Sequence, residues 1–500
     1  MAGVAAMALA GWAAPAAAGA QPHPTVRSEV PITATDIYNK PSNNSPQLAV
    51  DPTDARFVVV ANRLDAPFNC SLQASGDGGR SWVSARPVPQ LPEGADTCYA
   101  PEVAFGRHGL LYYLFVGLRE PGSSPMGVYL TTSRDRAHSF SPPRQVLGPR
   151  HYGVRMAFDP TYGAQGRIHL VWLEANSDPP LGGLPSPPNP IMAAHSDDGG
   201  ATFSPPVHVS DSAHPLAVAP AATIGANHSL HVLYYDLGDD QRDYRGLEGT
   251  RWEGNWSLVA ATSPDAGGHF APGVTVDDGV VPPERVMLIF TMPPAALVAD
   301  GHGGLYAAWH DARNDDWDVF LRHSPDGGRT WSPATQVNDN RGRDETHQYL
   351  PRLSVAPNGR LDVIFYDRRN NVENRGNDVY YTFSNDRGAT FAPNRKLTAL
   401  DSDSMVGPKY AVPSAMGMVD FGSRLGLVST NARVLAAWTD TRFTARGNPA
   451  QDIFGTEIDF GAGSSGVPGW LAGAGVAVGW TAAGLAAWGL IQRRNRREQA

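Results

Sequence analysis

The amino-acid sequence predicts an all-β protein, a β-propeller of seven four-stranded blades, followed by one C-terminal transmembrane helix. Three observations lead to this fold class. An eight-residue turn pattern recurs six times, seven pairs of strands can be recognised around it, and the 500 residues include 53 glycines and 43 prolines. Glycine and proline at this density suit many short strands joined by turns, and a fixed repeat period is typical of an architecture built from similar units.

The turn pattern has the form S-x-D-x-G-x-[ST]-[WF], and its first copy runs from Ser75 to Trp82. Successive aspartates are 58, 63, 67, 61 and 60 residues apart; in two copies Ala137 replaces the glycine and His269 replaces the Ser/Thr. An aspartate carboxylate accepts several backbone N–H bonds in a tight turn, and glycine supplies the positive-φ position. We therefore expect hairpin turns built on six structural aspartates: Asp77, Asp135, Asp198, Asp265, Asp326 and Asp386.

Seven strand pairs set the number of blades. Each pair opens with an alternating strand, as at residues 46–50, and continues into a very apolar strand. The seventh unit has a third strand at residues 452–458, but it lacks the turn pattern and a fourth strand. Residues 26–34 are expected to supply that strand, because closing the ring hides the exposed edges of the first and last blades. Six blades are the alternative.

The two ends of the chain predict export and a membrane anchor. Residues 1–20 are apolar and small and end in Ala-Gly-Ala, which fits signal-peptide cleavage before Gln21. A Gly/Ser linker at residues 461–466 leads into the uncharged segment 467–491. A helix of that length spans roughly 37 Å, more than the hydrocarbon core of a bilayer at about 30 Å.

The basic tail, residues 492–500, sets the orientation in the membrane. By the positive-inside rule this tail is cytoplasmic, so the propeller, residues 21–460, is expected on the outside of a single-pass cell-membrane protein. There the two cysteines, Cys70 and Cys98, are expected to form a disulfide. The net charge is −9, so the sequence lacks the excess of basic residues that is typical of a nucleic-acid-binding protein. The expected partners are the membrane and a surface glycan or protein.

The loops at the end opposite the turn pattern are rich in charge, and three of them share an Asp-x-Arg unit followed by a further aspartate. Residues i and i+2 of a strand point the same way, so each arginine is expected beside its own aspartate. We favour ion pairs that brace each hairpin. In the other interpretation the arginines bind an anionic ligand in the central funnel. That binding would need a further arginine without an aspartate of its own, and Arg63 and Arg352 are the nearest candidates by position. The three units are Asp311, Arg313 and Asp318; Asp367, Arg369 and Asp378; and Asp440, Arg442 and Asp452.

The turn pattern resembles the Asp-box, or BNR, repeat of the sialidase-like superfamily, and the resemblance covers about residues 25–460. It implies a glycan-directed propeller. Sialidases of this superfamily hold the sugar carboxylate with three arginines, use a Glu-activated tyrosine as nucleophile and use an aspartate as acid/base. This chain departs from that pattern in two respects: it contains no Arg-Ile-Pro motif, and it has seven predicted blades where catalytic sialidases have six.

Four residues are weak candidates for catalysis. Glu174 and Asp236 end apolar strands at the charged end of the ring, and Tyr235 and Tyr366 lie nearby in the strand pattern. Two carboxylates across a funnel can serve glycoside hydrolysis by acid/base chemistry. More often such residues form hydrogen bonds at a strand end.

Two functions therefore stay open. One is a membrane-anchored, extracytoplasmic, sialidase-like propeller that acts on or binds glycans, with exo-glycosidase activity implied by the resemblance alone. The other is a non-catalytic surface propeller that binds carbohydrate or protein. No cofactor is expected. Two acidic loops could attract Ca²⁺ but lack the full calcium-loop pattern, and they contain Asp315, Asp316 and Asp318, and Asp239, Asp240 and Asp243.

Overall fold

The computed structural model describes residues 24–33, 42–65, 68–83, 89–120, 124–177, 187–240, 252–282, 293–340, 344–371, 373–407, 421–442 and 451–461. The predicted signal peptide, the apolar segment 467–491 and the basic tail lie outside these ranges, as does the linker beyond Gly461. Within them, no helix is long and apolar enough to cross a bilayer.

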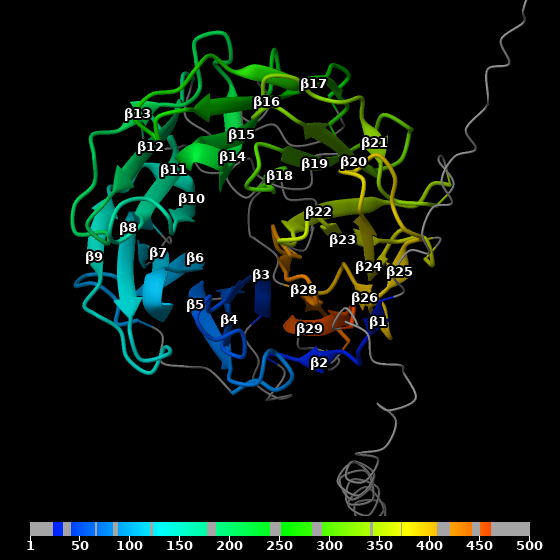
Figure 1. The fold of residues 1–500 in the computed structure, drawn as a ribbon, viewed down its shortest axis with the longest axis horizontal. Helices are drawn as coiled ribbons and strands as arrows, with labels where there is room; N and C mark the ends of the chain where they lie inside the picture. The colour runs from blue at the N-terminus through cyan, green and yellow to red at the C-terminus, as the bar shows by residue number, and fades with distance from the viewer. Residues whose placement is uncertain are drawn as a thin grey trace, which may run out of the picture. The chain divides into compact units, whose positions relative to one another are not determined.

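Seven antiparallel sheets surround a central axis, as Figure 1 shows. Blades are numbered along the chain. Blades 1 to 3 contain β3 (Ser42–Val50), β4 (Val58–Asp65) and β5 (Asn69–Ser75); β6 (Thr97–Phe105), β7 (Leu111–Arg119), β8 (Ser124–Ser133) and β9 (Arg144–Leu147); and β10 (His151–Asp159), β11 (Arg167–Glu174), β12 (Ile191–Ser196) and β13 (Val207–His208).

Blades 4 to 6 follow the same order. They contain β14 (Ala217–Ile224), β15 (Leu230–Asp236), β16 (Trp256–Ser263) and β17 (Val274–Val280); β18 (Ala296–Ala299), β19 (Leu305–Asp311), β20 (Asp318–Ser324) and β21 (Thr335–Gln336); and β22 (Gln348–Val355), β23 (Leu361–Asp367), β24 (Gly376–Ser384) and β25 (Arg395–Lys396), with β26 (Ser402–Asp403) also on β24.

Blade 7 closes the ring with both ends of the propeller. It contains β27 (Gly426–Ser429), β28 (Arg433–Asp440) and β29 (Asp452–Asp459), and its outer strand is formed by β1 (Thr25–Val26) and β2 (Val30–Pro31). Val26 pairs with Ile458 and Val30 pairs with Gly455. The prediction of seven blades closed by the N-terminal segment is therefore confirmed, and the alternative of six blades is wrong.

The described part of blade 1 has three strands and, beyond them, one bridge between Val83 and Ala74. The disulfide between Cys70 and Cys98 ties this blade to blade 2, with Cα atoms 5.6 Å apart, which confirms that pairing. A cross-link of this kind contributes on the order of 3 kcal/mol to stability.

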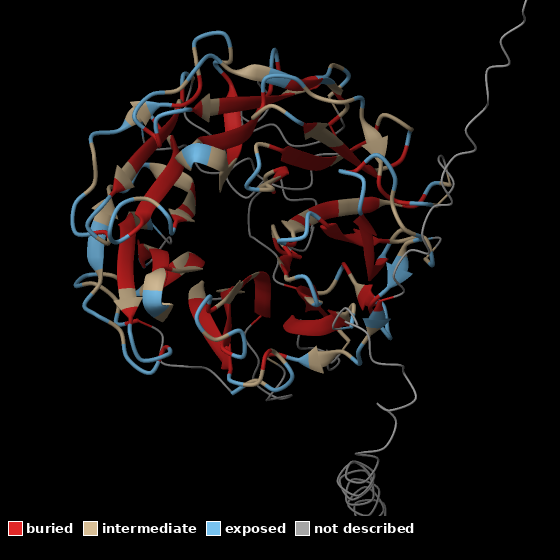
Figure 2. Ribbon diagram, viewed as in Figure 1, coloured by how far each residue is buried: buried red, intermediate tan, exposed pale blue. Residues whose placement is uncertain are grey.

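Apolar layers between neighbouring blades form the core, and Figure 2 shows the buried strands around the ring. The aromatic residue that ends each turn pattern packs against one of these layers, so every turn also fills a gap between blades. These aromatics are Trp82, Phe140, Phe203, Phe270, Trp331 and Phe391.

Each turn of the repeated pattern is held by its aspartate as expected. Asp326 Oδ1 accepts the N–H of Thr330 at 2.9 Å, and the Thr330 hydroxyl donates to Oδ2 at 2.8 Å. The two central positions have positive φ, and Ala137 adopts φ 62° where the other copies have glycine. In the other imperfect copy, His269 Nδ1 lies 2.5 Å from Asp265 Oδ2 and replaces the missing hydroxyl.

We expect Asp326→Ala to lower the free energy of unfolding by about 1–2 kcal/mol, because the turn N–H groups lose their acceptor. Chemical denaturation measures this, with the exposed Asp278→Ala as control. Any ligand affinity of the folded fraction should be unchanged. Weaker binding at an unchanged melting temperature would contradict a purely structural role.

Acid should destabilise the ring below pH 6.5. Burial lowers the pKa of His169 to about 3 and the pKa values of His231, His310 and His347 to about 4. These side chains stay neutral in the folded protein at pH values where the unfolded chain binds protons. Their stabilising effect is therefore complete above pH 6.5 and falls as pH drops towards 4, by about 1.4 kcal/mol per pH unit for each histidine. Buried carboxyls with raised pKa oppose part of this slope.

Denaturation curves between pH 4 and 7 check the acid effect. His169→Phe should reduce the slope of the free energy of unfolding against pH by about 1.4 kcal/mol per pH unit, the effect of one bound proton. The reason is that His169 has no accessible surface and neither of its ring nitrogens has a hydrogen-bond partner among the described residues. Replacement of the exposed His302 by glutamine is the control. An identical slope in wild type and His169→Phe would rule this histidine out.

Candidate functional site: the central channel

The inner strands of the blades surround the central axis (Figure 1). Charged side chains from four blades interact there. Glu102 on β6, Arg155 on β10 and Arg352 on β22 hold equivalent places, since each directly follows a shift of register in its strand. Arg424 lies two residues before β27. Sequentially distant segments thus bring one carboxylate and three guanidinium groups together.

Glu102 is the acceptor at the centre of this cluster. Its Oε1 accepts from Arg155 Nη1 and Arg424 Nη1, both at 3.0 Å, and its Oε2 accepts the N–H of Met156 at 2.7 Å. Arg424 Nε also donates to the carbonyl of Ser45 at 3.0 Å. One carboxylate, 4% exposed, therefore links blades 2, 3 and 7.

Arg352 has no such acceptor. Its Nε is buried without a hydrogen-bond partner, and within the described residues its guanidinium takes part in no ion pair. Burial lowers its pKa, Glu102 opposes that change, and the charge of Arg155 adds to it. Burial likewise lowers the pKa of Arg424 to about 10, with repulsion from Arg155 and Arg352 among the causes.

The cluster carries more positive than negative charge. Among the described residues, three guanidinium groups surround a single carboxylate, and burial penalises the charged forms of Arg352 and Arg424. Charge of one sign in a low-dielectric channel attracts a mobile ion of the other sign, and the guanidinium fork matches a carboxylate or sulfate. The channel can therefore hold an anionic group.

The Asp-x-Arg arginines have a different environment. Each one binds its own aspartate at 2.6 or 2.7 Å and also binds a second carboxylate: Arg313 that of Asp277, Arg369 that of Asp339 and Arg442 that of Glu29. Each guanidinium also lies over an aromatic ring of the third strand of its blade, at 4.4 to 4.5 Å from Phe320, Tyr380 and Phe454.

These contacts favour bracing over ligand binding. Asp311, Asp367 and Asp440 have no accessible surface, so their charges are compensated only through such partners. Burial raises the pKa of Asp311 and of Asp367 even so. The carboxylates that follow on the third strands are likewise occupied: Asp318 accepts from Asn338 at 2.6 Å, Asp378 from Thr398 at 2.8 Å and Asp452 from Thr33 at 3.2 Å.

The four catalytic candidates are not gathered into one acid/base pair by any contact of the described residues. Glu174 is 41% exposed and lies 3.8 Å from His151 Nε2. Asp236 is buried, which raises its pKa. Tyr235 and Tyr366 are also buried with raised pKa, and the Tyr366 hydroxyl donates to the carbonyl of Thr439 at 3.0 Å. A catalytic role for these residues stays a prediction without geometric support.

The acidic loops offer little to a metal ion. Among the residues that the structure describes, no three His, Cys, Asp or Glu side chains are placed to hold one. Asp240 accepts a hydrogen bond from Trp256 at 3.0 Å, and Asp243 lies outside the described residues. Asp316 is buried without a hydrogen bond from the described residues to its carboxylate, and Asp315 on the same loop is exposed.

Arg63, the other arginine named beside Arg352, is paired. Its Nη2 contacts Asp65 Oδ2 at 2.8 Å and its Nη1 donates to the Tyr99 hydroxyl at 2.9 Å. Sequence reasoning did not identify Glu102, Arg155 or Arg424. A signal was available in the sequence: a charged residue shortly after a proline or glycine in the first strand of a blade. An alternating strand normally has an apolar residue at that position.

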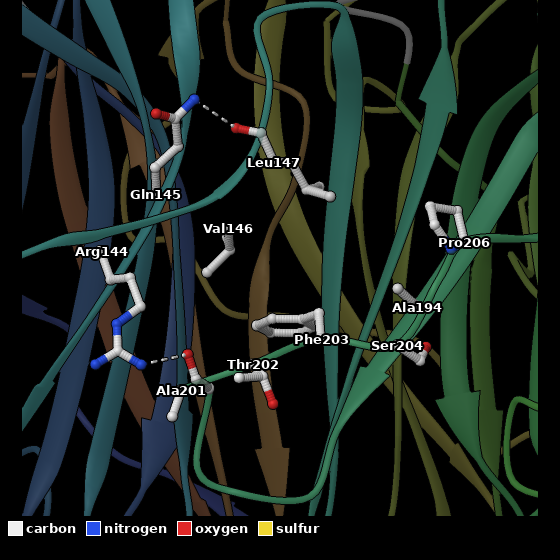
Figure 3. Close-up of a pocket in the computed structure, with 11 residues that line it drawn as sticks. Arg144, Gln145, Val146, Leu147, Ala194, Ala201, Thr202, Phe203, Ser204 and Pro206 are labelled. Carbon is white, nitrogen blue, oxygen red and sulfur yellow. Dashed lines mark hydrogen bonds between the residues drawn. The ribbon is translucent and has the colours of Figure 1, made fainter.

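A pocket of about 270 Å³ lies away from this cluster, beside the outer strand of blade 2 (Figure 3). Val146 and Leu147 of β9 and Phe203 of the next blade's turn form its apolar walls. Arg144, the charged residue among those described as lining it, donates to the carbonyl of Gly200 at 3.4 Å. The pocket therefore offers apolar packing and little chemistry.

No protein-family model and no curated protein matches the chain. Similar solved structures include a protein of unknown function from Dyadobacter fermentans DSM 18053, with 14% identity and a TM-score of 0.47, covering 88% of this chain and 100% of that one. A polysaccharide lyase named ulvan lyase has 12% identity and a TM-score of 0.48, covering 86% and 96%. A Hadza microbial sialidase has 13% identity and a TM-score of 0.42, covering 81% and 74%. At this level of similarity, none of them bears on what the site does.

We expect Arg369→Ala to destabilise the protein by about 3 kcal/mol, because it leaves Asp367 buried without its main partner. The double change Asp367→Asn with Arg369→Gln should recover part of that loss, which chemical denaturation of the single and double variants measures. Binding of carboxylated and neutral sugars by the folded fraction should change equally little. Selective loss of the carboxylated sugar would instead place Arg369 in the ligand site.

Proposed function

We propose that this protein is a membrane-anchored, extracytoplasmic propeller that binds glycans, and that its central channel receives an anionic group of the glycan. The observation that carries the proposal is the guanidinium of Arg352, which lies in the channel near Glu102, Arg155 and Arg424, has a buried Nε without a hydrogen-bond partner and forms no ion pair with the described residues.

An unpaired cation inside a protein lowers the stability of the folded state, and an apolar residue in its place would make the folded state more stable. Retention of such a group is typical of sites where stability is lost in exchange for binding. A carboxylate or sulfate placed beside Arg352 compensates its charge and reduces the repulsion from Arg155 and Arg424. Anion binding therefore explains why three arginines surround one glutamate.

The wider setting of the proposal comes from the sequence. The small, apolar N-terminus, the uncharged segment 467–491 and the basic tail support export and anchoring. The Cys70–Cys98 disulfide suits an oxidising compartment. The resemblance of the turn pattern to the Asp-box repeat supports a glycan as the ligand, because it is found in the sialidase-like superfamily.

Binding has more support than hydrolysis. A sialidase-type reaction needs a tyrosine nucleophile with an adjacent glutamate, and the candidates Tyr235 and Tyr366 are buried with raised pKa. The Tyr366 hydroxyl is moreover committed to a backbone carbonyl. Sialidase-type hydrolysis is the implication of the resemblance, and release of fluorophore from a fluorogenic sialoside by the purified protein tests it directly.

Arg352→Gln should weaken binding of a carboxylated sugar at least tenfold, because a neutral amide replaces the uncompensated charge. The same change should leave the melting temperature of the ligand-free protein unchanged or higher, since it removes an unpaired buried cation. Isothermal titration calorimetry and thermal denaturation measure the two effects. Glu102→Gln, which removes the partner of two arginines, should by contrast lower the melting temperature.

Replacement of Arg375, which pairs with Asp403 on the exposed surface, is the matched arginine control. Arg375→Gln should leave affinity unchanged. A glycan array on the wild-type protein shows which sugars bind. Equal binding of anionic and neutral glycans, or an Arg352→Gln protein that melts lower and binds normally, would overturn the proposal.

A further inference from the structure

An aromatic cluster lies beside the arginines, at the seam between blades 5 and 6. Trp317 stacks on His347 with ring centres 4.5 Å apart and planes at 14°, and the edge of Tyr349 meets Trp317 at 5.7 Å. His310 completes the group at 5.7 Å from Trp317. Trp317, His347 and Tyr349, named the aromatic platform from here on, are each only half-buried.

The platform is rigidly supported. The backbone N–H of Trp317 donates to His347 Nδ1 at 3.4 Å, and the backbone carbonyl of Trp317 accepts the N–H of Gln348 at 2.7 Å. Arg368 lies over the Tyr349 ring at 5.0 Å and donates to its hydroxyl at 3.2 Å. These contacts hold the Trp317 backbone against blade 6 and position the Tyr349 side chain.

The platform is also uncharged near neutral pH. Burial lowers the pKa of His347 to about 4, with the charge of Arg368 as a second cause. Burial lowers the pKa of His310 to about 4, with His347 as a second cause. The neutral imidazole of His347, the indole of Trp317 and the phenol ring of Tyr349 thus present apolar faces with polar edges, a surface that suits a ring bearing both C–H groups and hydroxyls.

Strand β22 connects the platform to the arginine cluster. Tyr349 pairs with Tyr366 and Arg352 pairs with Ile364, while the residues between them form a bulge in which Leu350 has φ 55°. The two partners on β23 are two residues apart, so Tyr349 and Arg352 belong to the same face of the sheet. Their Cα atoms are therefore about 7 Å apart along the strand. That spacing is comparable to one pyranose ring with a carboxylate attached to it.

Resting on the function proposed above, we infer that the aromatic platform is a stacking subsite for a sugar whose carboxylate is attached directly to the ring. The carboxylate contacts Arg352, the C–H face of the ring packs on Trp317, and the edge of the ring contacts Tyr349, whose plane lies at 82° to that of Trp317. This arrangement selects ring-borne carboxylates, as in uronic acids, over carboxylates without a ring and over neutral sugars.

The wild-type protein tests this selection without any mutation. Calorimetric titration compares methyl glucuronide, which has ring and carboxylate, with methyl glucoside, which has the ring alone, and acetate, which has the carboxylate alone. Methyl glucuronide should bind at least tenfold more tightly than either. Equal affinity for methyl glucuronide and acetate would overturn the stacking subsite and leave anion binding in place.

Variants test the platform itself. Trp317→Leu should weaken methyl glucuronide about five- to tenfold and leave acetate unchanged. Trp331→Leu is the matched control, because Trp331 is a half-buried tryptophan in a turn at the other end of the same blade. Arg352→Gln should weaken both anions. Tyr349→Phe keeps the ring and should bind normally, so it distinguishes loss of stacking from loss of a hydroxyl.

The two proposals fail in different ways. If neither a carboxylated nor a sulfated sugar binds to wild type, the proposed function is wrong. A second outcome is that acetate and methyl glucuronide both bind and that Trp317→Leu changes their affinities no more than Trp331→Leu does. In that case the channel binds anions and the platform is only structural.

Discussion

Closure of the ring is the constraint on which the other features depend. Pairing of β1 and β2 with β29 covers the last sheet edge and holds seven blades at fixed angles around the axis. With the inner strands held in this way, side chains from blades 2, 3, 6 and 7 have to share one narrow space. The hydrogen bond from Arg424 to Glu102 joins residues 322 positions apart, and it exists because the ring is closed.

The protein uses arginine in two physically different ways. Arg313, Arg369 and Arg442 are each compensated by two carboxylates and an aromatic face, so they hold loops to blades and have little attraction left for a ligand. In the channel, three guanidinium groups share one carboxylate, that of Glu102, as far as the described residues go. Since burial of an uncompensated charge is costly, the imbalance in the channel points to ligand binding, whereas the balance at the rim points to stability.

Local chemistry allowed the turns, the blade count and the closure to be predicted. The turn pattern encodes its own hydrogen bonds, because the described donors to Asp326 lie within four positions of it. The Asp-x-Arg ion pairs were predictable for the same reason, with each partner two residues away. The second carboxylates, Asp277, Asp339 and Glu29, were not predictable, because they come from other segments that only the packed ring brings near.

The candidate site shows where sequence reasoning ends. Arg352 was recognised by its position, but its lack of a partner depends on which side chains surround it, and Glu102, Arg155 and Arg424 carry no local pattern. By itself, the sequence determined the all-β repeat architecture, the hydrogen-bonded turns at the six aspartates and the pairing of two cysteines, because these follow from short-range hydrogen bonds, periodicity and composition. The tertiary structure alone decided which charges are compensated and which aromatic rings stand next to them. That outcome depends on distances and burial between segments hundreds of residues apart, and on a low-dielectric interior that forms only when the ring closes.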